Sequence, residues 1–388
     1  MVRIHPKTLE DLEFPSVLGQ IASFAITDPG KRAVSKIQPF KKVSDISPEL
    51  HRVKEFTASF NSDNRIPNHG FEALDKELHL LTIENSVLEI ASFRRIVSVC
   101  DLQEERAQNA AKRHQAVAYT DHQKMLERND LDAIYLSLPV FAHGQPELAV
   151  IERGLPFLVE KPVAINLETA QQVAEAVEQA NLITCAGYQL RYLGSTQLTK
   201  RLLADQTVSM AMGKYWCGTG RGDPNTWIRQ MDKSGGQLVE QATHTIDMMR
   251  HLMGEVTEVF SLQANRVLRD IDCPDSYTVT LQFESGAIGT LTTYWAFDNG
   301  DWSNANVIDI LYQDQLINWN PSRLEVKEAG EVVSKTEPGP SIDQVFVDAV
   351  RRQDPSQILS PYADAVKSLA ISLAANRSAK SGQIVPVG

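Results

Sequence analysis

Apolar and polar residues follow three successive patterns along the 388-residue chain, and each pattern predicts a different kind of structure. Up to about residue 96 the apolar residues recur at helical spacing, so we expect a helical N-terminal segment. From 97 to 187, short β-branched runs alternate with helical stretches, which is typical of a parallel sheet flanked by helices. From 188 to 388, long β-type runs predict an α+β domain with a mainly antiparallel open sheet.

The alternating part predicts strands at 96–100, 132–136, 156–159 and 183–186, and helices at 104–113, 146–153 and 167–179. The run 96–100 can be interpreted in two ways, because it could also continue the helix predicted before it.

The last part predicts strands at 208–216, 256–267, 277–283, 287–295 and 307–311. The tripeptide 284–286 contains a glycine between two of these runs and predicts a hairpin. Residues 236–252 have helical spacing. The tail 342–380 has it too, and we expect this tail to pack back on the rest of the chain.

The composition fits a soluble globular protein of two or three domains. The formal net charge of −11 argues against a nucleic-acid surface, which needs clustered Lys and Arg. No apolar run reaches the roughly 18 residues of a membrane span, and the first residues lack the apolar stretch of a secretory signal. A cytoplasmic location is therefore expected. The scattered cysteines form no CxxC pair, so we expect neither disulfides nor a metal site.

Polar residues follow the predicted parallel strands. In a doubly wound sheet the ligand lies beyond the carboxyl ends of the strands, so these residues are candidates for a binding site. They are Asp101, Ser137 with Pro139 and His143, Glu160 with Lys161, and Tyr188 with Arg191. Each alone is a weak signal, because an acidic residue after a strand caps a helix at least as often as it binds a ribose.

Lys161 gives the sharpest signal among them. It stands between an apolar strand and Pro162, which holds the lysine at the edge of the sheet and allows a cis peptide bond. An ammonium group there can hydrogen-bond a substrate hydroxyl and lower its pKa as a hydride leaves. The alternative is a solvated loop lysine.

Glu240, His244 and Asp247 fall on one side of the helix predicted at 236–252. A carboxylate one turn before an imidazole can orient a general base whose ordinary pKa is about 6.5. The alternative is a structural histidine with satisfied hydrogen bonds.

Together these motifs resemble the glucose–fructose oxidoreductase / inositol dehydrogenase / rhizopine-catabolism (Gfo/Idh/MocA) family from about residue 97 onward. The motifs are Pro139 with His143, Glu160-Lys161-Pro162, Gly187-Tyr188-Gln189-Leu190-Arg191, Gly235-Gly236 with His244-Thr245-Ile246-Asp247, Ser285-Gly286-Ala287-Ile288-Gly289, and Ala375-Asn376-Arg377-Ser378-Ala379-Lys380-Ser381-Gly382. The resemblance implies a Rossmann-like nucleotide-binding domain at 97–187 and a substrate and oligomerisation domain at 188–388.

The resemblance also implies an NAD(P)-dependent oxidoreductase that acts on a CH–OH group of a sugar, polyol or related small molecule. Lys161 and His244 carry over as catalytic residues, and Glu240 supports them at a position where the family often has Asp. The residues expected to face the cofactor are Asp101, Ser137, Pro139, His143, Glu160 and Lys161. The residues expected to face the substrate are Tyr188, Arg191, Trp227 and Asp247.

Two further expectations concern the cofactor and the assembly. Asp101 favours NAD over NADP, because a carboxylate repels a 2′-phosphate. A homo-oligomer, either a dimer or a tetramer, is expected by analogy with the family. Trp227 could equally be an interface anchor.

The first strand of that family, its G-x-G-x-x-G turn and the helix after it have no counterpart here. The glycines before Asp101 are Gly19, Gly30 and Gly70, which lie too far apart. The turn normally places backbone amides against the pyrophosphate. Its strand is normally central, so we expect an unpaired strand edge in this sheet.

Residues 1–96 instead resemble the N-terminal region of the second branch of the MutS family of DNA-processing ATPases, through segments 4–14 and 64–71. No G-x-x-x-x-G-K-[ST] loop occurs in the chain. We infer a fusion in which a helical segment replaces the first βα unit of a dehydrogenase. Two alternatives to an oxidoreductase stay open: a dehydrogenase-like scaffold without cofactor, and a DNA-repair fragment, which the acidic balance disfavours.

Overall fold

The computed structural model describes residues 96–218, 226–297, 305–328 and 331–388. Residues from Arg95 onward form one unit. The helices predicted before residue 96, and the segments that resemble the MutS family, lie outside the described residues.

The parallel strands form two small sheets. In the first, β1 (Ser98–Cys100) pairs with β2 (Val117–Tyr119), and in the second the order is β3 (Ile134–Leu136), β4 (Phe157–Val159), β5 (Thr184–Ala186). The run at 98–100 is therefore a strand and not a continued helix. Within the described residues no strand joins β1 to β3, which agrees with the unpaired edge expected where the first family strand would lie.

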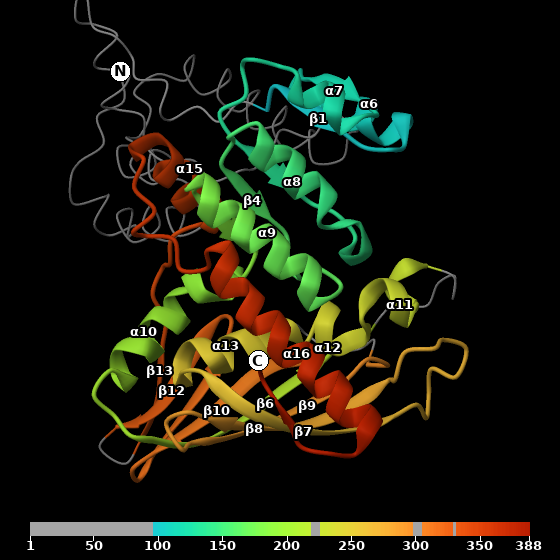
Figure 1. Cartoon of the computed structure of the whole chain (residues 1–388). Helices are drawn as coiled ribbons and strands as arrows, with labels where there is room; N and C mark the ends of the chain where they lie inside the picture. The colour runs from blue at the N-terminus through green and yellow to red at the C-terminus, as the bar shows by residue number, and fades with distance from the viewer. Residues whose placement is uncertain (1–95, 219–225, 298–304, 329–330) are drawn as a thin grey trace, which may run out of the picture. The chain divides into compact units, whose positions relative to one another are not determined.

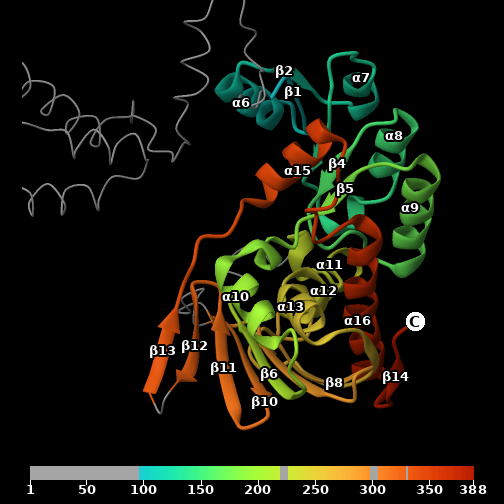
Figure 2. The same cartoon turned by 90° about the vertical axis from the view of Figure 1, so that its left-hand side faces the viewer.

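Helices cover both faces of β3–β5. The helices of this part are α6 (Glu104–His114), α7 (His122–Leu126), α8 (Gln145–Glu152), α9 (Leu167–Ala180) and α15 (Ile342–Arg352). Phe157 and Val159 share a core with α8 and α9, whereas Leu158 shares one with α15 (Figure 2). Because neighbouring residues of a strand point to opposite faces, β4 is apolar on both sides.

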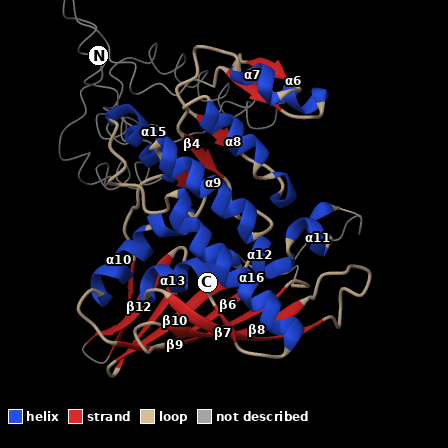
Figure 3. Ribbon diagram, viewed as in Figure 1, coloured by secondary structure: helices blue, strands red, loops and turns tan. Residues whose placement is uncertain are grey.

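The second sheet has nine strands in the order β13-β12-β11-β10-β6-β9-β8-β7-β14. Figure 3 shows this sheet in red beneath the helices that cover it. Every neighbouring pair is antiparallel except β6 and β9. The predicted hairpin is confirmed as β8–β9. The strands are β6 (Val208–Trp216), β7 (Val256–Ala264), β8 (Ser276–Phe283), β9 (Ile288–Tyr294), β10 (Asn306–Tyr312), β11 (Gln315–Asn320), β12 (Arg323–Glu328), β13 (Glu331–Lys335) and β14 (Val385–Pro386).

One face of this sheet is covered by helices (Figure 1). They are α10 (Gly194–Leu203), α12 (Gly236–Glu240), α13 (Thr243–Met253) and α16 (Tyr362–Ser381). The other face, called the open face below, carries the exposed side chains of Met212, Trp216 and Ile288. The long helix α16 packs against both β7 and α9, so it joins the two parts of the unit.

The prediction of one helix over 236–252 was wrong. The helix breaks at Gln241, whose φ of −122° and ψ of −51° are not helical. The Gln241 side chain accepts hydrogen bonds from Trp295 Nε1 at 2.9 Å and Cys217 Sγ at 2.7 Å. Gln241 thus binds residues distant in the sequence at the point where the helical backbone geometry is lost.

The prediction of a helical tail over 342–380 was also only partly right. It divides into α15 and α16, with Pro355 and Pro361 in the connecting stretch. A proline disfavours helical geometry in the residue before it and donates no backbone hydrogen bond, which accounts for the interruption. None of the described helices combines the length and apolar character that crossing a membrane requires.

A glycine lets α13 approach the sheet closely. A Cβ atom built on Gly289 of β9 would lie 2.7 Å from Met249 Cε and 2.9 Å from Phe283 Cε2. There is thus no room for a side chain beneath the helix that carries His244.

We predict that Gly289→Val destabilises the protein by about 1–3 kcal/mol, because the added methyl groups overpack this contact. Denaturant unfolding followed by circular dichroism measures the change. The matched control is Thr290→Val, the next residue of β9, which points to the open face and should change stability by less than about 0.5 kcal/mol. Equal effects of the two substitutions would contradict the prediction.

Candidate functional site

Lys161 and Glu240 bring the two parts of the chain together at one site. Lys161 follows β4, and its peptide bond to Pro162 is cis, as the sequence allowed. Its Nζ donates a hydrogen bond to the carbonyl oxygen of Glu240 at 2.6 Å and lies 3.6 Å from Glu240 Oε1. These contacts engage at most two of the three ammonium hydrogens, so a third can bind a ligand.

His244 lies at the start of α13 and is 6% exposed. Burial, and secondly the charge of Lys161, lower the pKa of His244 well below 6.5. The imidazole is therefore neutral at pH 7, the form that can accept a proton. The break at Gln241 means that Glu240 and His244 lie on separate helices. Glu240 contacts Lys161 directly, and the charge of Lys161 acts on His244.

Gly187 makes room for the carboxylate of Glu160. A Cβ atom at position 187 would lie 2.9 Å from Glu160 Oε2. The Glu160 side chain is exposed at the carboxyl end of β4, and its Oε2 accepts a hydrogen bond from the Lys161 backbone N–H at 3.3 Å. Glu160 and Lys161 are thus presented together at the edge where a ligand of a doubly wound sheet binds.

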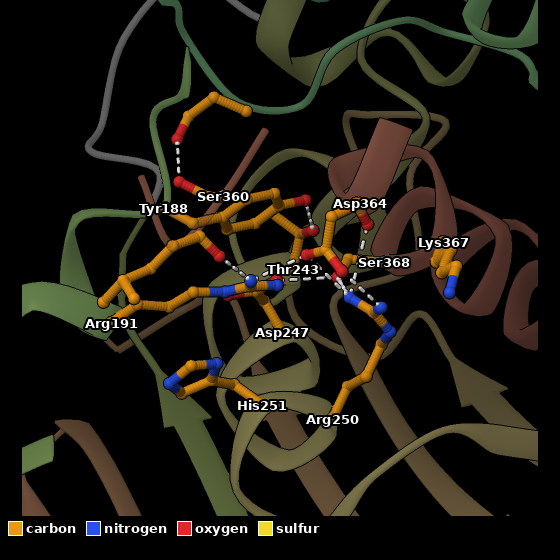
Figure 4. Close-up of polar contacts among 12 residues, drawn as sticks. Tyr188, Arg191, Thr243, Asp247, Arg250, His251, Ser360, Asp364, Lys367 and Ser368 are labelled. Carbon is orange, nitrogen blue, oxygen red and sulfur yellow. Dashed lines mark hydrogen bonds and ion pairs between the residues drawn. The ribbon is translucent and has the colours of Figure 1, made fainter. Parts of the chain in front are cut away.

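Arg191 and Asp247, both predicted to face the substrate, are buried and bound to each other (Figure 4). Arg191 Nε donates to Asp247 Oδ2 at 2.8 Å, and its Nη2 donates to Oδ1 at 2.6 Å. Tyr188 is only 1% exposed and shares a hydrogen bond of 3.0 Å with Thr243 Oγ1. These contacts favour a structural role for the three side chains over direct contact with a substrate.

The ion pair of Arg191 and Asp247 extends to Asp364 and Arg250, which the sequence did not predict as site residues. Asp364, in the first turn of α16, lies 2.6 Å from Arg191 Nη1 and 2.7 Å from Arg250 Nη2. Arg250 also binds Glu255. Burial alone would raise the pKa of Asp364, but the hydrogen bonds and charges of the two arginines outweigh burial and lower the pKa to about 2. No local pattern pointed to Asp364, because its partners lie more than a hundred residues earlier in the chain.

His143, predicted to face the cofactor, is turned into the protein. Its Nδ1 lies 2.6 Å from Glu147 Oε1, and both side chains are almost fully buried. Glu147 Oε2 accepts a hydrogen bond from the Gly144 backbone N–H at 2.6 Å. The pair closes the first turn of α8, and the His-x-x-x-Glu spacing could have predicted it.

Trp227 lies on the short 3-10 helix η4 (Trp227–Arg229), in the second part of the chain. Its ring meets that of Phe141, on η2 (Val140–Ala142), with centroids 6.2 Å apart. Lys233 Nζ, on α11 (Met231–Ser234), lies 6.0 Å from the Phe141 centroid. Since η2 follows β3, this cluster lies at the same sheet edge as Lys161, and Trp227 also bridges the two parts.

The described residues fit some parts of a dinucleotide and not others. Asp101 lies at the end of β1, and its Oδ1 accepts a hydrogen bond from the Gln103 N–H at 2.8 Å. Ser137 is exposed after β3. The sequence, however, has no G-x-G-x-x-G turn to bind the pyrophosphate. Within the described residues, β1 and β3, which would lie on either side of the strand before such a turn, belong to separate sheets. Within the described residues, no group of three or more His, Cys, Asp or Glu side chains could hold a metal ion.

Two family models match the chain. The model for an oxidoreductase family with an NAD-binding Rossmann fold matches residues 77–188, and the model for the GFO/IDH/MocA C-terminal domain matches residues 206–310. Together they cover more than half of the chain. The first match begins before β1, so the similarity starts earlier than residue 97.

The sequence identity to individual relatives is low. The chain is 27% identical to the uncharacterised oxidoreductase YrbE of Bacillus subtilis, over 51% of this chain and 59% of that protein. It is 24% identical to myo-inositol 2-dehydrogenase of Thermotoga maritima, over 54% of this chain and 64% of that protein. The chain thus spans less than two thirds of the length of these relatives.

Solved structures share the fold. A levoglucosan dehydrogenase in complex with NADH and L-sorbose has a TM-score of 0.69 at 20% identity, covering 77% of this chain and 91% of that chain. An oxidoreductase from Agrobacterium radiobacter in complex with NAD+, L-tartaric acid and magnesium has a TM-score of 0.67 at 19% identity, covering 76% and 91%. No comparison supports the MutS-like interpretation of residues 1–96.

We predict that Lys161→Gln raises the pKa of His244 toward 6.5, because it removes the positive charge beside the imidazole. The rise should be partial, since burial is the larger cause and is unchanged. NMR titration of histidine-labelled protein measures it, with the exposed Lys380→Gln as the matched control. An unchanged or lower pKa in Lys161→Gln would show that the two groups are not electrostatically coupled.

Proposed function

Because the chain belongs to the Gfo/Idh/MocA oxidoreductase family, we propose that it transfers a hydride between a CH–OH group of a sugar or polyol and NAD(P). The observation that carries the proposal is the contact of Lys161 with Glu240 beside the buried, neutral His244. Relatives named as inositol 2-dehydrogenases, and the levoglucosan dehydrogenase that holds NADH with L-sorbose, support this substrate class.

The proton chemistry follows from the charges of these side chains. The neutral imidazole of His244 takes the hydroxyl proton of the substrate. The ammonium of Lys161 donates a hydrogen bond to the same oxygen and stabilises the negative charge that develops there. Glu240 holds the ammonium through its carbonyl oxygen and its carboxylate, so Lys161 is oriented before the substrate arrives.

The cofactor would lie along the carboxyl ends of the parallel strands. A bound NAD(P) would supply the hydride acceptor. The residues that would hold it are Asp101, Ser137, Pro139 and Glu160, with His143 fixing the segment between β3 and α8. Asp101 favours NAD, because its carboxylate would repel a 2′-phosphate.

A specific observation favours a second candidate function, a dehydrogenase-like scaffold that does not bind cofactor. The sequence has no G-x-G-x-x-G turn, and within the described residues no strand fills the place between β1 and β3. The pyrophosphate would lose the backbone amides that normally bind it. Nothing in the described residues supports the third idea, a DNA-repair fragment.

Titration of the purified chain with NADH separates the first two candidates. Saturable quenching of tryptophan fluorescence, or enhancement of NADH fluorescence, supports the enzyme. An absence of saturable binding at millimolar NADH would favour the scaffold, whatever the ancestry of the chain.

We predict that Lys161→Ala lowers the turnover of a sugar or polyol substrate by at least about 100-fold, because the developing alkoxide loses its hydrogen-bond donor. NADH absorbance during oxidation of a panel of sugars and inositols measures it. Lys380→Ala, on the exposed end of α16, is the control and should keep full activity. A Lys161→Ala variant as active as the parent would refute the mechanism.

We propose further that two copies of the chain associate through the open face. Large apolar side chains are unusually exposed there: Met212 at 46%, Ile288 at 40% and Trp216 at 38%. They lie on the adjacent strands β6 and β9, so they form one patch. A twofold axis lets the same patch cover itself.

We predict that Met212→Glu converts the oligomer to a monomer, because each interface would then bury a carboxylate without a partner. Size-exclusion chromatography with light scattering measures the mass. Leu102→Glu places the same charge on the other part of the chain, at a residue 89% exposed, and should leave the mass unchanged. A parent protein that is already monomeric would overturn the proposed association.

A further inference from the structure

The ring of Tyr188 lies beside the buried ion pair of Arg191 (Figure 4), and it also packs against the imidazole of His244. We propose that Arg191, held by Asp247 and Asp364, is a positioning residue that fixes the imidazole of His244 through the ring of Tyr188. The inference rests on the proposed role of His244 as proton acceptor. It gives Tyr188, Arg191 and Asp247 a function other than the substrate contact expected from the sequence.

Arg191 is fixed by carboxylates on two different helices. Asp247 of α13 binds Nε and Nη2 in a bidentate pair, and Asp364 of α16 lies 2.6 Å from Nη1. Ser368 of α16 donates a further hydrogen bond to Asp247 Oδ1 at 2.6 Å. A planar guanidinium held at both ends has little freedom to rotate.

The fixed guanidinium determines where the Tyr188 ring lies. Arg191 Cζ is 5.7 Å from the centroid of that ring, within the range of a cation–π contact. The hydroxyl at the far end of the ring shares its hydrogen bond with Thr243, the residue directly before His244. The ring is therefore held at its face by Arg191 and at its hydroxyl by α13.

The imidazole of His244 packs against this ring. The two centroids are 6.5 Å apart and the planes are nearly perpendicular, at 88°. Such a contact restricts rotation of the imidazole about its own axis. A proton acceptor must present one nitrogen to the substrate, so a restricted rotation contributes directly to its efficiency.

The arrangement also makes the site sensitive to the docking of distant elements. Arg191 comes from η3 (Gln189–Tyr192), directly after β5, whereas its partners belong to α13 and α16. If α16 moves away, Arg191 loses its contact with Asp364. The Tyr188 ring that packs against His244 is then held less firmly. The C-terminal helix thereby influences a catalytic residue that it does not carry.

Arg250 provides a matched control. It shares Asp364 with Arg191 and binds Glu255, but its hydrogen bonds in the described structure reach neither Asp247 nor Tyr188. Replacing either arginine by lysine keeps the charge and removes the planar fork. Only Arg191→Lys should disturb Tyr188 and His244.

The test compares Arg191→Lys with Arg250→Lys by NMR of histidine-labelled protein, using His244→Gln to assign the resonance. We expect Arg191→Lys to shift and broaden the His244 ring signals, and Arg250→Lys to leave them in place. With a sugar or polyol substrate, Arg191→Lys should lower kcat by about tenfold or more while KM changes less than about threefold. Arg250→Lys should keep kcat within about threefold of the parent.

Two substitutions of Tyr188 keep the proposal falsifiable if Arg191→Lys does not fold. Tyr188→Leu removes the ring and leaves the ion pairs, so it should reproduce the NMR change, whereas Tyr188→Phe keeps the ring and should show much less of it. Unchanged His244 signals in both Arg191→Lys and Tyr188→Leu would overturn the proposal, and so would equal changes in Arg191→Lys and Arg250→Lys. The NMR readout does not need turnover, so an inactive parent would refute the proposed function without deciding the positioning role.

Discussion

The hydrogen bond from Lys161 Nζ to the carbonyl oxygen of Glu240 joins residues 79 positions apart, and the candidate site exists only where this bond forms. It connects the carboxyl end of β4 with the end of α12, so it holds a parallel sheet against the helical layer of a nine-stranded sheet. The same contact places a positive charge near His244. That charge and the burial of the imidazole keep the histidine neutral, which is what the proposed proton transfer requires.

Around this bond, the described residues bring together the side chains proposed for proton transfer, but they include no glycine turn that could bind a pyrophosphate. His244 is buried, Lys161 and Glu240 are partly buried, and Glu160 beside them is exposed. Within the described residues the parallel strands divide into a β1–β2 sheet and a β3–β5 sheet. In the proposed mechanism, Lys161 and His244 would supply the acid and the base. The affinity of the chain for a dinucleotide then depends on contacts other than the usual backbone amides.

The buried ion pairs show how the second part of the chain supports the first. Arg191 and Arg250 balance Asp247 and Asp364 in the buried part of this network, between η3, α13 and α16, and the more exposed Glu255 and Lys367 extend it. Removing one member would leave a charge buried without its partner, which is costly in a medium of low dielectric constant. This constraint fixes the approach of α16, and within the network Arg191 contacts the ring of Tyr188, which packs against His244.

The sequence by itself predicted many of the elements and the candidate residues of the site, although it missed β2, α7 and β11 to β13. Alternating patterns predicted β6 with its exact observed bounds, the β8–β9 hairpin, and the strand and helix succession from β3 to β5, because such periodicity is a local property of the chain. Lys161, Glu240 and His244 were proposed as site residues from the residues next to them in the chain. Only the tertiary structure decided that the helix breaks at Gln241, that Arg191 and Asp247 bind each other, and that Asp364 joins their ion pair. These outcomes depend on side chains brought together by folding, and a pattern that extends over a few residues carries no information about a partner far away in the sequence.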